Sequence, residues 1–190
     1  MNMNVMFSSD DMTWATPQSF FNQLNDEFHF TLDPCCGHNT AKCEKYYTKD
    51  MDGLSKSWEN QIVFMNPPYG REIYEWIEKA YNESVYNNAI VVCLIPARTD
   101  TKYWHDFCMK ASEIRFVKGR LKFGNSDNSA PFPSAVIIFR PNDNNVKVYP
   151  MISDNMYTPL YPIYTPPLSQ IYPSMIQPCM ITPAVIVKKE

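Results

Sequence analysis

The residues with the clearest chemical meaning in this chain are Asn66-Pro67-Pro68-Tyr69, which directly follow the apolar run 62–65. The run predicts a buried strand, and two consecutive prolines, with fixed φ and no N–H group, predict that it ends in a rigid turn. The Asn66 side-chain oxygen and the Pro67 carbonyl could both accept hydrogen bonds from one –NH2 group. The Tyr69 ring could stack on the flat group that carries this amine. Such a turn suits the methylation of a conjugated amino nitrogen; the simpler alternative is a proline-stiffened turn without chemistry.

The expected chemistry depends on hydrogen-bond acceptors rather than on a base. A conjugated amine is a poor nucleophile because its lone pair is delocalised, and two acceptors favour the tetrahedral nitrogen that forms during attack. This nitrogen becomes strongly acidic only after the methyl group arrives, so no low-pKa base is needed. A base inside a duplex must be extruded first. We expect only the ring of Tyr69, and not its hydroxyl, to matter for stacking on that base.

A methyl donor would have to bind beside this turn, and three upstream residues suit that purpose. Asp33 ends another predicted strand and could hold an ammonium group. Gly37 lies in the loop that follows and lets a ligand approach the backbone closely. Asp52 could accept a hydrogen bond from an adenine amine. A carboxylate after a strand is also a common turn cap, and we prefer that alternative for Asp50.

The pattern of apolar residues predicts strands that alternate with helices. Thr16 suits a helix cap and Pro17 a first helical position, which predicts a helix over the following residues. Further helices are expected at 72–87 and 102–111. Strands are expected at 28–32, 46–48, 62–65, 89–95, 113–117 and 133–139, with a mobile loop at 124–130. This alternation predicts an open, mostly parallel α/β sheet with ligands at the carboxyl ends of its strands.

Composition and length indicate one globular domain with a tail. The 190 residues are 45% hydrophobic and 14% aromatic, without a membrane-length apolar run or a signal-peptide pattern, so a cytoplasmic protein is expected. We expect a flexible start at 1–12, a catalytic domain at 13–141 and a Pro-rich tail at 142–190. Half of the 16 prolines follow residue 149. The tail could be a disordered linker or an arm that packs on a partner, including a second copy.

Basic residues are concentrated in one stretch, although the net charge is −3. An acidic chain cannot bind nucleic acid through bulk charge alone, so the position of its cations matters more than their sum. The alternative is an ordinary solvated surface. The densest set consists of Arg98, Arg115, Lys118, Arg120 and Lys122.

Six cysteines are present, and their spacing suits neither disulfides nor zinc. Two are adjacent and one lies in a predicted buried strand, so reduced thiols are expected. The nearest approach to a metal motif is the cluster Cys35, Cys36, His38 and Cys43, which lacks the paired spacing of structural zinc sites. No metal is expected.

Two motifs together resemble a known family. Asp33-Pro34-Cys35-Cys36-Gly37, followed by Asn66-Pro67-Pro68-Tyr69, is similar to the donor and catalytic motifs of S-adenosylmethionine-dependent amino methyltransferases. Other stretches resemble, in order, the small phage-encoded, Dam-like DNA N(6)-adenine methyltransferases. These are Trp14-x-Thr16-Pro17, Asp52-Gly53-Leu54, 96–101, 119–124 and 131–134.

The resemblance implies a compact Rossmann-like methyltransferase fold with late antiparallel strands and assigns roles to particular residues. Thr16 and Pro17 would help to hold the methionine part of the donor. Other donor contacts would come from Asp33, Cys35, Gly37, Asp52 and Asn66, and Asn66, Pro67, Pro68 and Tyr69 would hold the target base. DNA contacts are expected from Arg98, Lys118, Arg120, Lys122 and Phe123. The short segment between Gly37 and the catalytic strand implies that one strand–helix unit is missing or shortened.

These expectations define an enzyme that transfers methyl from S-adenosylmethionine to the N(6) amine of a flipped adenine in double-stranded DNA. Protection of phage DNA from restriction in the host cytoplasm is what the resemblance suggests as the purpose. Two alternatives remain open at this point. One is a methyltransferase for an RNA base or a protein glutamine, and the other is a non-catalytic phage module that binds DNA or a host protein.

Overall fold

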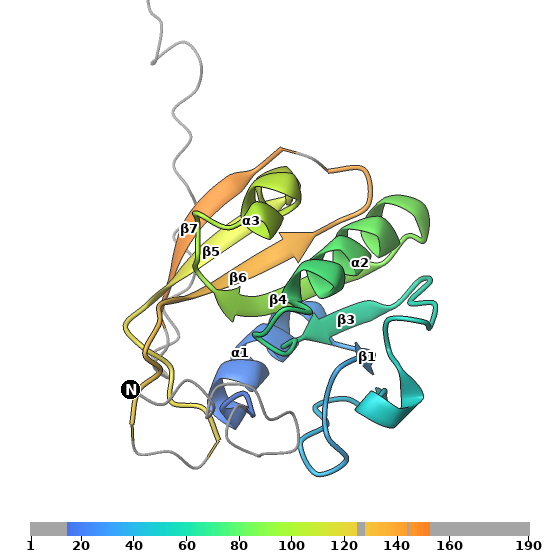
Figure 1. The fold of residues 1–190 in the computed structure, drawn as a ribbon, viewed down its shortest axis with the longest axis horizontal. Coiled ribbons are helices and arrows are strands. Elements are labelled where there is room, and N and C mark those ends of the chain that lie inside the picture. The colour runs from blue at the N-terminus through green and yellow to red at the C-terminus, as the bar shows by residue number, and fades with distance from the viewer. Residues whose placement is uncertain (1–14, 125–127, 144, 153–190) are drawn as a thin grey trace, which may run out of the picture. The chain divides into compact units, whose positions relative to one another are not determined.

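The computed structural model describes residues 15–124, 128–143 and 145–152. The expected flexible start at 1–12 and most of the Pro-rich tail lie outside these residues. The described chain forms an α/β structure (Figure 1). Its helices are α1 (Gln18–Phe28), η3 (Lys49–Met51), α2 (Ile73–Tyr86), α3 (Lys102–Asp106) and η4 (Cys108–Lys110). Its strands are β1 (Leu32–Asp33), β2 (Lys45–Tyr46), β3 (Ile62–Met65), β4 (Ile90–Pro96), β5 (Glu113–Lys118), β6 (Ser134–Phe139) and β7 (Lys147–Ile152).

The strands form one sheet in the order β2-β1-β3-β4-β6-β5-β7. In the described part of the chain, only β6 runs antiparallel to its neighbours, β4 and β5. The other pairs are parallel. The carboxyl ends of β1, β3, β4 and β5 therefore lie at one edge, together with the beginning of β6. The expected mostly parallel, Rossmann-like sheet with late antiparallel pairing is confirmed.

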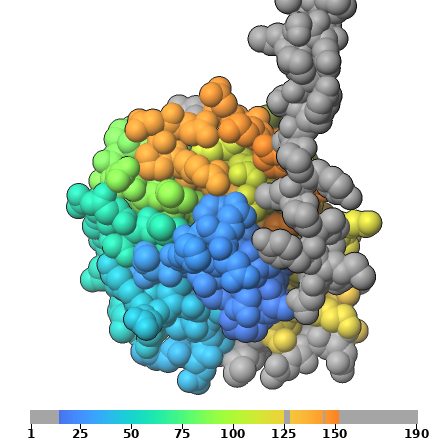
Figure 2. All heavy atoms as spheres, turned by 180° about the vertical axis from the view of Figure 1, so that it is seen from behind, coloured from blue at the N-terminus to red at the C-terminus, as the bar shows by residue number. Residues whose placement is uncertain are grey.

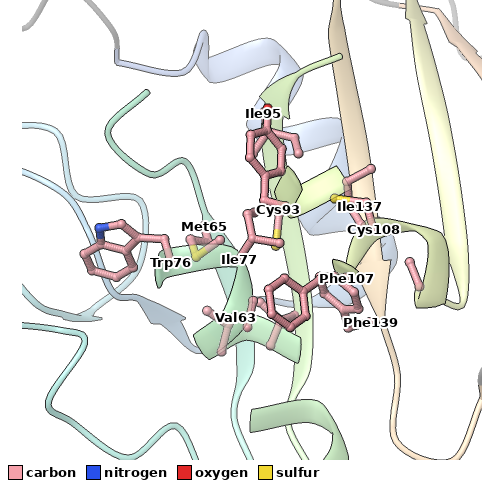
Figure 3. Close-up of a cluster of buried hydrophobic side chains, with 14 of the residues drawn as sticks. Val63, Met65, Trp76, Ile77, Cys93, Ile95, Phe107, Cys108, Ile137 and Phe139 are labelled. Atoms are coloured by element: carbon pink, nitrogen blue, oxygen red, sulfur yellow. The ribbon is translucent and has the colours of Figure 1, made fainter. Parts of the chain in front are cut away.

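Helices cover the two faces of this sheet, and each face has its own apolar core. On one face, α2 and α3 contribute side chains to the same apolar core as Val63 and Met65 of β3. Figure 3 shows part of this core. On the other face lies α1, seen in blue in Figure 2. Four α1 side chains are buried there at the expected helical spacing: Phe20, Phe21, Leu24 and Phe28. Each buried side chain of this kind contributes roughly 1.5–3 kcal/mol, so packing holds α1 in place.

The strand expected at 28–32 is wrong over most of its length. Phe28 is the last residue of α1, and His29 follows with a left-handed backbone (φ 55°). The Phe30 N–H then donates to Asn25 Oδ1 at 2.9 Å, so the alternating residues belong to a helix end and a turn. Only Leu32 and Asp33 join the sheet. Apolar and polar residues that alternate over a few positions do not distinguish a strand from a helix end followed by a turn, because a helix end can also bury every second residue.

The connection between β1 and β3 is short, as expected. It contains the two-residue strand β2 and the single-turn helix η3, with no α-helix. Gly53 follows η3 and packs against Pro34, where a Cβ atom would lie 2.0 Å from the Pro34 carbonyl oxygen. Only glycine allows the two loops to approach this closely.

The sheet continues beyond residue 141, where the catalytic domain was expected to end. Strand β7 pairs in parallel with β5, with Met151 opposite Val117. This stretch contains Pro150, which is compatible with a strand only at a sheet edge. Strand β7 occupies that edge position.

Candidate active site

Asn66 follows the last residue of β3, and the prolines end the strand as expected. Met65 pairs with Cys93 of β4, which places Asn66 at the carboxyl edge of the sheet. Side chains alternate across a strand, so Asn66 shares the α1 face with Phe64. Asn66 is half-buried, and Pro67 is buried. The strand therefore delivers one amide and one proline carbonyl to the edge where parallel sheets bind ligands.

The Tyr69 hydroxyl lies on the Asn66 amide. Its O–H donates to Asn66 Oδ1 at 2.5 Å, and the Leu94 carbonyl oxygen lies 3.4 Å from the same hydroxyl. Asn66 Oδ1 is the atom expected to accept a hydrogen bond from the substrate amine. The expectation that only the ring of Tyr69 matters therefore omitted a contact, because in this structure the hydroxyl donates to the expected acceptor, Asn66 Oδ1.

Two buried phenylalanines hold the Tyr69 ring. Its centroid lies 5.4 Å from that of Phe132 and 6.3 Å from that of Phe123, both in edge-on arrangements. We call Tyr69, Phe123 and Phe132 the aromatic box. Phe123 was expected to contact DNA, and the structure buries it in this box. Sequence reasoning missed Phe132, although it lies in the stretch 131–134 that contributed to the resemblance.

A buried hydroxyl lies on the same face near the box. Ser134 begins β6 and pairs with Pro96, so it sits at the carboxyl edge of β4. It is 1% exposed, and its Oγ has no hydrogen-bond partner within the described structure. A buried hydroxyl without a partner is unfavourable. Ser134 was not among the predicted site residues, because a serine at the start of a strand has no distinguishing pattern.

On the donor side, Asp33 ends β1 and is almost fully buried. Its Oδ2 accepts a hydrogen bond from the Lys42 N–H at 3.1 Å. Burial raises the pKa of Asp33 to about 6, although hydrogen bonds from the backbone of Lys42 and Cys35 oppose this rise. A buried carboxylate is stabilised by a cationic group, so Asp33 suits an ammonium.

The segment before α1 provides a second polar group for a donor. Thr16 was expected to cap α1, and this is wrong: the cap position is Pro17, and no side chain caps the helix. The Thr16 hydroxyl is instead buried, with no partner in the described part of the chain. The adjacent Ala15 carbonyl accepts a hydrogen bond from the Gly124 N–H at 2.8 Å. This bond places the segment beside the aromatic box.

The remaining predicted donor residues surround the same region. Gly37 is exposed in a turn whose N–H lies 3.0 Å from Thr40 Oγ1. The Asn66 backbone N–H donates toward the Cys35 sulfur, which joins the donor loop to the catalytic turn. Asp52 is exposed with a left-handed backbone (φ 50°). The structure thus brings Thr16, Asp33, Cys35 and Asn66 to one edge, and Asp52 directly precedes Gly53, which packs against Pro34.

The cysteines nearest the donor loop are protonated thiols. Burial raises the pKa of Cys35, Cys36 and Cys43, which opposes the thiolate form that metals bind. Over the described ranges, no group of three or more His, Cys, Asp or Glu side chains could hold a metal ion.

Most of the predicted DNA contacts are exposed at the same edge, but one cation of the dense basic set is not. Arg98 follows β4, and Lys118, Arg120 and Lys122 lie at or after the end of β5; all four are exposed. Arg115 is 4% exposed. It makes a two-pronged ion pair with Glu27 of α1 at 2.6 and 2.7 Å and a further bond to Glu113. Arg115 therefore differs from the four exposed cations of this set.

Comparison with known proteins places the chain among DNA adenine methyltransferases by sequence. The family described as DNA N-6-adenine-methyltransferase (Dam) matches residues 4–155. A DNA N-6-adenine-methyltransferase of Haemophilus phage HP1 (strain HP1c1) is 30% identical over 142 residues, covering 70% of this chain and 81% of the relative. One of Escherichia phage T1 is 30% identical over 111 residues, covering 57% of this chain and 45% of the relative.

The chain belongs to the DNA N-6-adenine-methyltransferase (Dam) family. The resemblance inferred from the motifs is confirmed, and with it the expectation of an enzyme of this class. Separately, none of the helices within the described ranges has the length and apolar character needed to cross a bilayer.

Proposed function

We propose that this protein transfers the methyl group of S-adenosylmethionine to the N(6) amine of an adenine flipped out of double-stranded DNA at specific sites. The observation that carries the proposal is the turn at the end of β3, which presents the Asn66 amide beside a tyrosine and two buried phenylalanines. This arrangement combines an acceptor for an amine with flat walls for a base. Exposed cations at the same edge suit the DNA backbone.

Each residue of the site has a defined task in this reaction. S-adenosylmethionine, when bound, supplies an electrophilic methyl group. Asn66 Oδ1 and the Pro67 carbonyl accept hydrogen bonds from the two amine hydrogens, which favours a tetrahedral nitrogen as its lone pair becomes available. The extra proton on the methylated nitrogen is then lost to water. The aromatic box excludes water and stacks on the base.

Thr16, Pro17, Asp33, Cys35, Gly37 and Asp52 would hold the donor. The buried Thr16 hydroxyl without a partner and the buried Asp33 carboxylate are the observations that fit it. Asp33 would pair with the ammonium of the methionine part, Thr16 would supply a hydrogen bond, and Asp52 would accept from the adenine amine. The exposed Gly37 loop leaves room for a ligand close to the backbone.

Transfer of a labelled methyl group to three substrates tests the proposal. Purified protein and radiolabelled S-adenosylmethionine are incubated separately with duplex DNA, tRNA and a release factor. We expect N(6)-methyladenine in DNA only. Label in tRNA would support a methyltransferase for an RNA base, and label in a glutamine side chain would support a methyltransferase for a protein. Donor binding without transfer to any substrate would support a binding module.

Donor affinity should depend on pH through Asp33. The carboxyl becomes protonated as the pH falls through about 6 and then no longer attracts an ammonium. We therefore expect S-adenosylmethionine affinity to be constant above about pH 7 and to fall up to tenfold per pH unit below 6. Calorimetric titration between pH 5 and 8 measures this profile.

The raised pKa of Asp33 also affects the stability of the protein without donor. Stability should fall as the pH rises, whereas donor affinity should increase. Because folding raises the pKa of Asp33, the free energy of unfolding should decrease as pH rises from about 4 to 6. Asp33→Asn should remove both dependences, whereas the exposed control Asp50→Asn should keep them. A donor-binding profile that is flat in wild-type protein would contradict the role of Asp33.

Lys118 and Lys122 are expected to contact DNA phosphates. Lys118→Ala and Lys122→Ala should each weaken binding to all sequences and reduce the slope of log affinity against log salt by roughly one unit. Fluorescence anisotropy at several salt concentrations measures both effects. Lys147→Ala is a matched control, because this exposed lysine lies at the opposite end of the β5–β7 pair.

The competing view is that the Pro-rich tail holds the DNA. A chain that ends at Ile152 retains β7 and removes the rest of the tail. If this shortened chain folds but loses DNA binding while the two lysine variants keep it, the phosphate assignment is wrong. The same chain shows, by its sedimentation, whether the tail joins two copies.

A further inference from the structure

A pocket of about 250 Å³ lies beside the catalytic turn and shares only Tyr69 with the aromatic box. Its walls include Tyr69, Tyr74 and Tyr103, and Arg98 lies at its rim. We call it the tyrosine pocket. Asn66 is not among its lining residues. Tyr103 belongs to the core under α2 and α3, whereas Phe123 and Phe132 belong to the core under α1. The tyrosine pocket and the aromatic box therefore lie toward opposite faces of the sheet.

Tyr69 is the residue that the two spaces share. It packs against both apolar cores and lines the tyrosine pocket while its hydroxyl contacts Asn66. A group in the tyrosine pocket would thus be separated from the reacting base by the thickness of one ring. In a DNA strand, the nucleotide next to the target is joined to it by one phosphate, so its base is the group that can reach this pocket while the target is bound.

The walls of the tyrosine pocket are fixed before any ligand arrives. The Tyr74 hydroxyl donates to Asp106 Oδ2 at 3.0 Å, and the Tyr103 hydroxyl lies 3.4 Å from the Pro96 carbonyl oxygen. The Thr101 hydroxyl donates to the Arg98 carbonyl at 2.7 Å, which fixes the backbone below the arginine side chain. Rigid aromatic walls suit a flat ligand, since stacking on them needs no further ordering.

The volume suits one base rather than the methyl donor. Pockets for drug-sized ligands measure roughly 300–1,000 Å³. The tyrosine pocket is smaller, and its lining contains no carboxylate that could pair with the ammonium of the donor. Asp33, which has such a carboxylate, lies on β1 and is not part of the lining.

The tyrosine pocket is surrounded by charges of both signs. Such a mixed set attracts phosphate weakly and favours a specific hydrogen bond from one side chain. Arg98 and Lys102 are exposed, but Asp100 is exposed on the same turn and Asp106 lies 4.0 Å from the Lys102 amine. Lys102 also lies over the Tyr74 ring at 5.1 Å. In the described part of the chain, neither a side-chain hydrogen bond nor an ion pair holds the Arg98 guanidinium, although its charge acts on the neighbouring Tyr103. Its planar group of donors can bond two acceptors on one base edge, which an ammonium cannot do.

We propose that the tyrosine pocket holds the base that adjoins the target adenine in the same DNA strand, and that the Arg98 guanidinium reads its edge. This inference rests on the proposed function and adds a determinant of sequence choice to it. It also assigns Arg98 to base reading, whereas the sequence left base and phosphate contacts equally open.

Arg98→Lys separates base reading from phosphate binding, because lysine keeps the charge and loses the paired donors. The probe is a pool of duplexes, each with one adenine flanked by randomised positions. Products carrying N(6)-methyladenine are captured and sequenced. For wild-type protein we expect a preference at one adjoining position. Arg98→Lys and Arg98→Gln should both reduce that preference by about 5- to 150-fold, the range for one paired contact.

Lys110→Gln serves as the control. It removes an exposed cation that lies over Tyr81 and Phe107, outside the pocket. This variant should retain the wild-type preference. The proposal is overturned if Arg98→Lys keeps that preference, or if Lys110→Gln reduces it equally. Wild-type protein that methylates no duplex in the pool would instead refute the proposed function.

Discussion

Asn66→Ala should reduce methyl transfer by roughly two to three orders of magnitude, the usual cost of removing one preorganised hydrogen-bonding group from a reaction site. The fold and the donor affinity should remain nearly unchanged, because the Asn66 side chain is half-buried at the end of β3 and its oxygen contacts the Tyr69 hydroxyl. Single-turnover transfer of labelled methyl, with saturating donor and DNA, measures the loss in the chemical step.

Asn82→Ala is a matched control for this experiment. Asn82 is also half-buried, but it lies on α2 away from the turn. It should retain wild-type turnover. If Asn66→Ala keeps more than a tenth of the wild-type rate, the catalytic role of the amide is wrong, and the acceptors must be sought elsewhere at this edge.

Two substitutions at Tyr69 should have opposite effects. Tyr69→Ala removes the ring and should weaken binding of the flipped base by about 1–3 kcal/mol. Tyr69→Phe keeps the ring and removes the hydroxyl that lies on Asn66 Oδ1. The substrate amine would then reach this acceptor without displacing another donor. Tyr69→Phe should therefore bind the base at least as well as wild-type protein, with a gain of up to about 1.5 kcal/mol.

Fluorescence of 2-aminopurine at the target position reports base flipping for the three proteins. We expect the flipped population to be lowest in Tyr69→Ala and highest in Tyr69→Phe. Phe132→Leu is a useful companion, because it loosens the aromatic box without touching Asn66. A loss in Tyr69→Phe as large as that in Tyr69→Ala would mean that the hydroxyl itself holds the base, and the stacking role would have to be abandoned.

Features encoded by neighbouring residues were predictable. The apolar run and the two prolines defined the end of β3, and helical spacing defined the buried face of α1. The orientation of Tyr69 was not predictable, because it depends on Phe123 and Phe132, which are distant in the sequence. A tyrosine after two prolines can point outward or inward, and only the tertiary packing decides.

Arg115 illustrates a second limit of prediction from the sequence. In the sequence it is one cation among several, and its partner Glu27 is 88 positions away. Nothing local distinguishes a buried, paired arginine from a solvated one. Strand β7 shows the same limit for backbone structure, since Pro150 is compatible with a strand only because β7 lies at the sheet edge.

The two attachments between the beginning of the chain and the segment around β5 couple two binding events. The Glu27–Arg115 ion pair joins α1 to β5. The Ala15–Gly124 hydrogen bond joins the segment before α1 to the loop after β5. Between these attachments lie Thr16 and Pro17, which are proposed to hold the donor, and Lys118 and Lys122, which are proposed to contact DNA. Strain that DNA imposes on the segment after β5 would therefore be transmitted to Thr16. By thermodynamic reciprocity, the factor by which DNA changes donor affinity is the factor by which donor changes DNA affinity.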